Sequence, residues 1–325
     1  MKAITISKYG QAIDLKWEEI PKPIPKKDEV LIKVMCTAVN DFDWSYVRGE
    51  PRAYRLFFGI SKPKFPVPGM EVSGVIEQVG ESVNDLKIGD RVFGDISEFG
   101  FGSFAEYLCV KEKALAKMPD RMSFEHAASL PHAGLLAWQG LVDLGKIQTG
   151  QKVLINGGGG GVGSFGVQIA KSFGCQVTGV DSADKFESMN ALGFDTCIDY
   201  RKVDFTKTGK QYDLILDCRA TRSPFAIAKS LTQNGTCIVI GGTVGVMLQF
   251  LFAGKIAELG SGKSLKILPL KTNQGLEKLN ERYTNGTLKC TIDGPYPLAE
   301  AGKWIQYFGE GKHIGKVVLK ATEDS

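Results

Sequence analysis

The spacing of apolar and polar residues changes near residue 123. Before that point, short runs rich in β-branched and other apolar residues stand between Pro and Gly, which is typical of strands. The predicted strands are residues 2–7, 29–38, 72–79, 91–93 and 104–110. Residues 1–122 are therefore expected to form a β-rich domain.

From Ser123 onward, helix and strand patterns alternate. Ser123 resembles a helix N-cap before an alanine-rich helical stretch. The strand candidates that follow are 153–155, 176–181, 196–200, 212–218, 235–242 and 264–270, with helical stretches around 166–171, 185–192, 224–231 and 246–259. Such alternation predicts a doubly wound parallel sheet, an α/β domain of the Rossmann type, which we place at residues 123–270.

Residues 271–325 are too few to form a domain alone. They include Pro295 and Pro297, a predicted helix at 299–308 and a predicted strand at 316–320. We expect this segment to return to the first domain and complete it.

A glycine-rich turn joins the first strand of the α/β domain to its first helix. Gly158, Gly160 and Gly163 have the G-x-G-x-x-G spacing, and Gly161 and Val162 complete the predicted phosphate-binding turn. The first glycine would permit a tight turn, the second a close approach to a pyrophosphate, and the third close packing of the helix. A linker or ligand-free turn is the alternative. The strand, helix and second strand in register favour a dinucleotide site.

Composition mainly excludes other classes of protein. The 325 residues exceed what one core usually supports, and 43% apolar with 23% charged residues is ordinary for a soluble protein. A net charge of +4 is too small to predict nucleic-acid binding, and no apolar stretch is long enough for membrane insertion. Seven cysteines without a C-x-x-C pair, and no secretory signal, predict a cytoplasmic protein with reduced thiols.

Several motifs, in their order and spacing, resemble the medium-chain dehydrogenase/reductase superfamily, and within it the zinc-independent quinone oxidoreductase-like branch. They are residues 39–43 (VNDFD) with Arg48-Gly49, 68–75 (PGMEVSGV), 87–92 (KIGDRV), 102–107 (GSFAEY), 130–134 (LPHAG), the glycine turn, and 315–318 (GKVV). The resemblance implies a GroES-like β domain made from both chain ends around a Rossmann domain. It also implies an active site between the domains and a homodimer.

Zinc-dependent members of this superfamily bind a catalytic zinc through a Cys, a His and a second Cys. The corresponding positions here are Asn40, Met70 and His132. An amide and a thioether are poor zinc ligands, and one imidazole cannot hold the ion. The closely spaced cysteines of a structural zinc lobe are also missing, so the sequence predicts no metal site.

Without a metal to act as Lewis acid, hydride transfer from NAD(P)H to an acceptor that is already electrophilic is the expected reaction. The resemblance implies quinones, or activated alkenes and carbonyls such as enones and enals, as acceptors. The protein would supply orientation and a hydrogen bond to the developing negative oxygen. An enoyl-thioester or alkenal reductase and a non-catalytic nucleotide-binding protein are the alternatives.

The candidates for catalytic residues are Asn40, Asp43 and His132. Asn40 would point its amide at the nicotinamide or the acceptor carbonyl, although an Asn that holds a β-turn is the alternative. Asp43 is expected to order the same loop. His132 would protonate the product oxyanion or enolate, with protonation by solvent as the alternative.

The end of the second strand carries conflicting indications of the cofactor. Asp181 favours NAD, because its carboxylate would accept the ribose hydroxyls and repel a 2′-phosphate. Ser182 and Lys185, however, resemble the Ser-x-x-Lys spacing with which NADPH-using quinone oxidoreductases hold that phosphate, and Tyr200 stands where they place a supporting tyrosine. We favour NADPH, with NADH as the alternative. The resemblance adds three more cofactor-binding positions: Gly241, Gly242 and Lys316.

Overall fold

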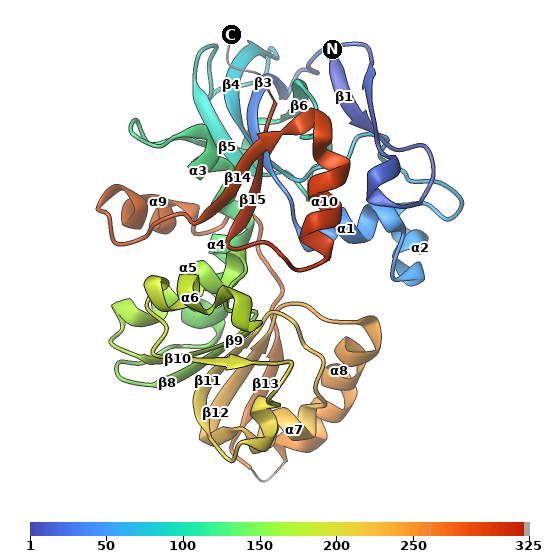
Figure 1. Ribbon diagram of the computed structural model, residues 1–325. Helices are drawn as coiled ribbons and strands as arrows, with labels where there is room; N and C mark the ends of the chain where they lie inside the picture. Colours follow the sequence, from blue (N-terminus) through green and yellow to red (C-terminus); the bar gives the residue numbers. More distant parts are fainter. Residues whose placement is uncertain (260, 322–325) are drawn as a thin grey trace. The chain divides into compact units, whose positions relative to one another are not determined.

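The computed structural model describes residues 1–259 and 261–321, and the chain forms two compact units (Figure 1). Unit 1 contains Met1–His132, Thr272–Thr284 and the described residues from Ile292 on. Unit 2 contains Ala133–Lys271 and Asn285–Thr291. Both ends of the chain therefore belong to unit 1. Its first stretch ends at His132, whereas the sequence placed this boundary at residue 122.

Unit 1 is built on a mostly antiparallel sheet with the strand order β14-β15-β3-β4-β5-β7, and β6 pairs with β3. Its strands are β3 (Glu29–Ala38), β4 (Glu71–Val79), β5 (Arg91–Asp95), β6 (Tyr107–Lys111), β7 (Ala116–Lys117), β14 (Ile292–Pro297) and β15 (Lys316–Lys320). Strands β1 (Lys2–Thr5) and β2 (Lys16–Glu19) form a separate antiparallel pair. The predicted β-rich domain made from both chain ends is confirmed.

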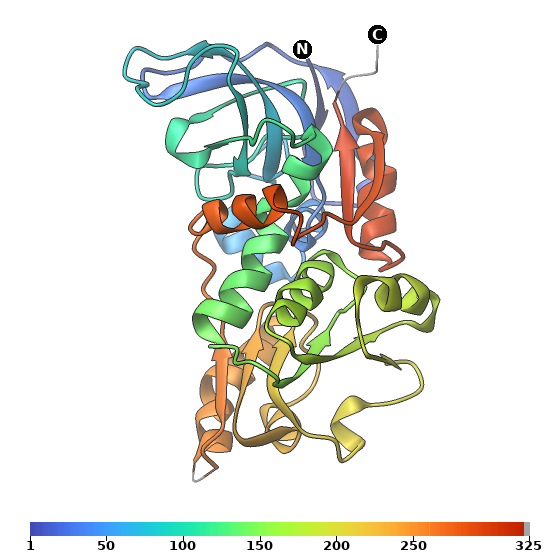
Figure 2. The same ribbon diagram turned by 90° about the vertical axis from the view of Figure 1, so that its left-hand side faces the viewer.

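Strand β15 is parallel to β14 on one side and antiparallel to β3 on the other. Figures 1 and 2 show this red C-terminal segment side by side with the blue N-terminal strands. The last strand of the chain therefore lies inside the sheet. Its Val317 and Leu319 are fully buried in one core cluster with Ile4, Val39 and Phe104.

The helices of unit 1 are α1 (Asp41–Arg48), α2 (Arg55–Phe58), α3 (Phe124–Ser129), α9 (Leu276–Thr284) and α10 (Ala301–Gly309). Three of them, α1, α2 and α9, were not predicted from the sequence. The segment after Asn40, expected to be a loop, is helix α1, because Asp43 accepts a hydrogen bond from the Asn40 backbone at its start and Gly49 ends it with a φ of 61°. Helix α9 buries Leu276 and Leu279.

Unit 2 contains a six-stranded parallel sheet with the order β10-β9-β8-β11-β12-β13, the order of a Rossmann domain, so the predicted fold is confirmed. The strands are β8 (Lys152–Asn156), β9 (Gln176–Asp181), β10 (Thr196–Asp199), β11 (Tyr212–Asp217), β12 (Leu231–Val239) and β13 (Ser264–Ile267). The helices that pack on them are α5 (Gly161–Ser172), α6 (Phe186–Leu192), α7 (Pro224–Lys229) and α8 (Val244–Glu258). Helix α4 (Pro131–Trp138) starts in unit 1 and continues into unit 2.

None of the helices in residues 1–259 and 261–321 has the length and apolar character needed to cross a bilayer.

Candidate active site

Unit 1 contains a buried cluster of charged and polar side chains, here called the acid-base cluster. Its members are Asn40, Asp43, Glu71, Asp95, His132 and Lys316. Five of them are at most 5% exposed, whereas the His132 side chain keeps 21% of its surface. The members come from distant segments that the sheet brings together.

Strand pairing explains why these residues meet. Glu71, the first residue of β4, lies opposite Asp95, the last residue of β5. Lys316 begins β15, and this strand runs antiparallel to β3, so Lys316 lies near the end of β3 and the Asn40 that follows it. His132 enters from the first turn of α4.

Lys316 and Glu71 form the centre of the cluster. The Lys316 Nζ atom lies 2.6 Å from Glu71 Oε2 and 2.5 Å from Asn40 Oδ1. Asn40 Nδ2 donates to Glu71 Oε2 at 2.9 Å and to the Ala38 carbonyl at 3.3 Å. Both ends of the Asn40 amide are thus engaged inside unit 1, and its predicted contact with cofactor or acceptor stays a prediction.

Asp43 caps the start of α1 and can hold a proton near neutral pH. Its Oδ2 accepts the Asn40 backbone N–H at 2.9 Å, while Oδ1 is buried and has no hydrogen-bond partner among the described residues. Burial raises the pKa of Asp43 to about 7, although the Asn40 hydrogen bond and the Lys316 charge act in the opposite direction.

His132 and Asp95 form a hydrogen-bonded pair at the edge of the cluster. His132 Nδ1 lies 2.7 Å from Asp95 Oδ2, and the His132 backbone N–H donates to Glu71 Oε1 at 2.7 Å. Burial alone would lower the pKa of His132, but the hydrogen bond and charge of Asp95, together with Glu71, outweigh it and raise this pKa. Burial would raise the pKa of Asp95, but its contacts with His132 and Ser97 outweigh burial and lower this pKa.

Asp95 was not predicted from the sequence. The available signal was an acidic residue directly after the apolar run of β5. A carboxylate at that position is buried by the neighbouring strand and must find a partner.

The positions that correspond to zinc ligands in the zinc-dependent enzymes hold side chains that are buried or bonded to other protein groups. Asn40 and His132 belong to the acid-base cluster, and Met70 is buried. The Lys316 ammonium already balances Glu71. Among the residues that the structure describes, no three His, Cys, Asp or Glu side chains are placed to hold a metal ion.

The glycine turn of unit 2 lies between β8 and α5. Gly157 has a φ of 90°, and the N–H groups of Gly157 and Gly158 both donate to the Val180 carbonyl, at 2.9 and 3.1 Å. The left-handed turn residue is therefore Gly157, not Gly158 as the spacing predicted. A Cβ on Gly163 would lie 2.4 Å from two backbone carbonyl oxygens, so this glycine is required for the close approach of α5.

The turn fits the pyrophosphate of a dinucleotide. Helix α5 begins at Gly161 with Gly160 as its N-cap, and its first turn contains no acidic residue. Its free N–H groups and positive helix end can accept an anion. A Cβ on Gly159 would approach the Lys185 side chain to 2.5 Å, so a larger residue there would displace Lys185.

Asp181 supports this glycine turn from the end of β9. Its Oδ2 accepts the Gly159 N–H at 2.9 Å, and its Oδ1 accepts the Ser182 N–H at 2.8 Å. Lys185 Nζ is 3.4 Å from Oδ1, and the two side chains are only 7% (Lys185) and 11% (Asp181) exposed. The carboxylate is directed at the protein backbone, so its predicted contact with a ribose stays a prediction.

The predicted residues around the cofactor ribose do lie together at the carboxyl ends of β9 and β10. Tyr200 follows β10, is half exposed, and donates its backbone N–H to the Asp181 carbonyl at 3.3 Å. Arg201, which sequence analysis missed, adds an exposed cation bonded to Asp184 at 2.9 Å. The residues brought together are Asp181, Ser182, Lys185 and Tyr200.

The turns after β11 and β12 are joined to each other. Gly241 follows β12, and its carbonyl accepts the Ala220 N–H at 2.9 Å, while Gly242 pairs with Ala220. Asp217, the last residue of β11, accepts the Asn156 amide at 2.7 Å. Its burial raises the pKa of Asp217 to about 6. The predicted role of Gly241 and Gly242 at the nicotinamide stays a prediction.

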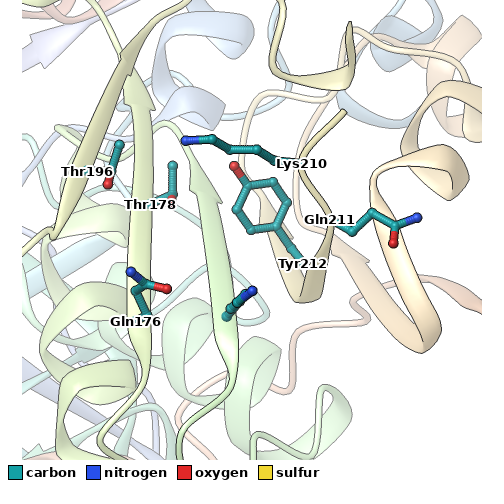
Figure 3. A pocket seen from close by; sticks show the side chains of 7 residues that line it. Gln176, Thr178, Thr196, Lys210, Gln211 and Tyr212 are labelled. Carbon is teal, nitrogen blue, oxygen red and sulfur yellow. The ribbon is translucent and has the colours of Figure 1, made fainter. Parts of the chain in front are cut away.

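A polar pocket on unit 2 lies away from these residues (Figure 3). It is lined by Lys152, Gln176, Thr178, Thr196, Lys210, Gln211 and Tyr212. Four of these are the first residues of β8, β9, β10 and β11, so the pocket lies at the amino ends of the parallel strands. Ligands of such sheets bind at the carboxyl ends, where the glycine turn lies, and we do not assign this pocket to the active site.

Two family models match the chain. The "Alcohol dehydrogenase GroES-like domain" matches residues 26–120, and "Zinc-binding dehydrogenase" matches residues 192–319.

Similar proteins extend over nearly the whole chain. A "Chloroplast envelope quinone oxidoreductase homolog" of Arabidopsis thaliana is 31% identical and the match covers 98% of each chain. The "NADPH-dependent alkenal/one oxidoreductase, chloroplastic" of the same plant is 33% identical, over 98% of this chain and 79% of the relative. The quinone oxidoreductase structure from Coxiella burnetii superposes with a TM-score of 0.87 at 28% identity, over 99% of both chains.

Proposed function

The chain belongs to the medium-chain dehydrogenase/reductase superfamily, in its quinone oxidoreductase-like branch, and we propose that it reduces quinones or activated alkenes with NADPH. The observation that carries this proposal is the glycine turn between β8 and α5. It fits a dinucleotide in a chain similar to quinone and alkenal reductases. The nicotinamide, when bound, supplies the hydride.

The preference for NADPH is supported by the environment of Asp181. Its charge is offset by Lys185 and by two backbone N–H groups, which weakens its repulsion of a 2′-phosphate. Tyr200 and Arg201 stand beside it, and Arg is well suited to bind phosphate. One relative is also named as NADPH-dependent.

We propose that the enzyme works without zinc. Asn40 Oδ1 already accepts a hydrogen bond from Lys316, and His132 Nδ1 is bonded to Asp95. A zinc ion would also have to displace the buried Lys316 ammonium from Glu71. Metal analysis of the purified protein is expected to find far less than one zinc per chain. A stoichiometric zinc content would overturn this part of the proposal.

Consumption of NADPH with a panel of quinones, enones, enals and enoyl thioesters tests the function. Turnover of quinones or enones is expected. Turnover restricted to thioesters would favour an enoyl-thioester reductase, and tight NADPH binding without any turnover would favour a nucleotide-binding protein.

The cofactor preference needs a mutation that does not leave Asp181 unpaired. We therefore compare Asp181→Asn/Lys185→Met with Arg201→Ala, each assayed for kcat/KM with NADPH and with NADH. Arg201→Ala is expected to lose roughly tenfold in kcat/KM for NADPH and little for NADH, whereas the double variant removes one repelling and one attracting charge and should change this ratio less. An equal loss with both cofactors in Arg201→Ala, or none, would contradict a 2′-phosphate site here.

A cytoplasmic location and a homodimer are further proposals, from the composition of the chain and from the family resemblance. Cell fractionation and light scattering of the purified protein test them. A membrane-bound or organellar fraction, or a monomer at micromolar concentration, would reject them.

A further inference from the structure

We propose that His132 and Asp95 form a proton-donating pair, in which His132 Nε2 delivers the proton that completes the reduction and Asp95 positions the imidazole. The inference rests on the proposed function, because it names the acid of the same reaction.

The geometry assigns the two ring nitrogens different tasks. An ionised carboxylate only accepts hydrogen bonds, so the contact of 2.7 Å with Asp95 Oδ2 places a proton on His132 Nδ1. Nε2 is then the nitrogen that gains and loses a proton, and it has no hydrogen-bond partner among the described residues. Asp95 is fully buried, whereas the imidazole keeps 21% of its side-chain surface. The pair therefore has one hidden end and one accessible end.

Glu71 cannot replace Asp95 in this role. One of its oxygens receives the Lys316 ammonium and the Asn40 amide, and the other receives the backbone N–H of His132. Glu71 therefore fixes the position of the backbone that carries the imidazole. Asp95 fixes the ring.

The charges that face His132 favour a protonated imidazole at rest. They are the carboxylates of Asp95, Glu71 and Asp43 and the ammonium of Lys316. When Asp43 holds a proton, two carboxylates face one ammonium, so an imidazolium makes the cluster neutral. This balance agrees with the raised pKa of His132. Loss of the proton leaves one net negative charge, which favours recovery of a proton from solvent.

The proposed step balances as follows for an enone. A hydride from the reduced cofactor bonds to the β-carbon, the electron pair of the C=C bond moves toward the carbonyl oxygen, and an enolate forms. The Nε2–H bond of His132 then breaks and its proton bonds to the α-carbon. For a quinone, the proton goes to an oxygen. Neutral His132 keeps its proton on Nδ1, where it is hydrogen-bonded to Asp95, and Nε2 takes a new proton from solvent.

Nitrogen NMR of the imidazole rings tests the pair without any cofactor. The chain has three histidines, so the spectrum contains signals from three imidazole rings. The signals that disappear in His132→Gln belong to His132. We expect His132 to be the Nδ1–H tautomer when neutral and to titrate above an ordinary histidine. Asp95→Asn keeps an oxygen acceptor but removes the charge, so it should lower the titration midpoint of His132.

His126 serves as the internal reference for this titration. It is bonded to the Tyr283 hydroxyl at 2.7 Å, and burial lowers its pKa, so its midpoint should lie below that of His132 and should not move in Asp95→Asn. An Nε2–H tautomer of His132, or an unchanged His132 midpoint in Asp95→Asn, would overturn the inference.

Kinetics separate a proton donor from a residue that only supports the fold. With an enone substrate, kcat should fall as pH rises through the titration of His132, and Asp95→Asn should move this fall to lower pH. His132→Gln should lower kcat on the order of a hundredfold with little change in the KM for NADPH. Asp28→Asn is the matched control, because Asp28 is an exposed carboxylate paired with Lys111.

The stereochemistry of the product gives a second readout. In D₂O, an α-methyl enone should receive deuterium on one face of its α-carbon from wild type and on both faces from His132→Gln. Full turnover of His132→Gln with an unchanged pH profile and one product stereoisomer would reject the proton-donating pair while leaving the reductase function intact. Absence of turnover by wild type on every acceptor would reject both.

Discussion

Each unit buries a lysine against a carboxylate, but the two ion pairs are built differently. Lys185 and Asp181 are separated by four positions: Asp181 ends β9, and Lys185 lies in the turn that leads to α6. Lys316 and Glu71 are 245 positions apart and meet because β15 enters the sheet of unit 1 beside β3. One ion pair is a local feature of the chain, and the other is a product of the completed sheet.

The surroundings of the two carboxylates differ as well. Asp181 keeps 11% of its side-chain surface and is held by two backbone N–H groups. Glu71 keeps none, and two of its three hydrogen bonds come from Lys316 and Asn40 side chains. A carboxylate that depends on side chains in the absence of water should suffer more when its lysine is removed.

Replacement of Lys316 should therefore have the largest effect on stability. Lys316→Met leaves the Glu71 charge buried without its cation, so we expect a loss of about 3–5 kcal/mol in the free energy of unfolding, measured by urea denaturation. The double variant Glu71→Gln/Lys316→Met removes both charges and should recover much of this loss. If the double variant is no more stable than Lys316→Met, charge is not the cause.

A mutation of Asp43 should change stability in the opposite direction. Its pKa rises from 3.8 to about 7 on folding, so the folded state binds the proton more tightly and this group destabilises the fold increasingly as pH rises from about 4 to 7. Asp43→Asn should stabilise the protein by about 2 kcal/mol at pH 8.5 and by much less at pH 5. Thermal unfolding at the two pH values measures this, and an equal effect at both would contradict the raised pKa.

Lys185→Met should destabilise unit 2 less than Lys316→Met destabilises unit 1. We expect a loss of about 1–2 kcal/mol, because the Asp181 carboxylate keeps its backbone donors and some solvent. Asp181→Asn/Lys185→Met provides the matched double variant. Equal losses in Lys185→Met and Lys316→Met, measured under the same conditions, would remove the distinction between the two ion pairs.

An exposed ion pair sets the lower end of this scale. Lys111 and Asp28 are bonded at 2.7 Å, but their side chains are 46% and 53% exposed. Lys111→Ala should leave the melting temperature unchanged, because water replaces the lost contact and salt screens such pairs. A clear drop would show that ion pairing alone, without burial, stabilises this protein.

Local patterns were sufficient to predict the fold of unit 2. A short apolar strand, a glycine turn and a helix are neighbours in the chain, and Asp181, Ser182 and Lys185 follow at fixed spacings, so the sequence predicted their proximity. It did not predict that Asp181 would bind Gly159, because the direction of a side chain depends on packing around the turn. The exact turn residue, Gly157, was missed because four other glycines follow it directly.

The acid-base cluster was only partly predictable. Asn40 and His132 were named through the family resemblance, and Lys316 was expected at the cofactor. Glu71 and Asp95 meet these residues because of the order and register of β15, β3, β4 and β5, which no local spacing encodes. Helix α1 was also missed, although Asn40 and Asp43 have the three-residue spacing of a helix-capping pair.

The position of β15 inside its sheet sets an order of events during synthesis on the ribosome. Strands β3 to β7 emerge first, but the sheet cannot bury Glu71 beside its cation until residue 316 has left the exit tunnel. Unit 2 ends at residue 291 and can fold while unit 1 still lacks a strand. A nascent chain with a C-terminal extension, stalled when residues up to 315 have left the exit tunnel, should therefore resist proteolysis in unit 2 and be cut within residues 1–132. Full protection of unit 1 at that length would show that its sheet forms without its last strand.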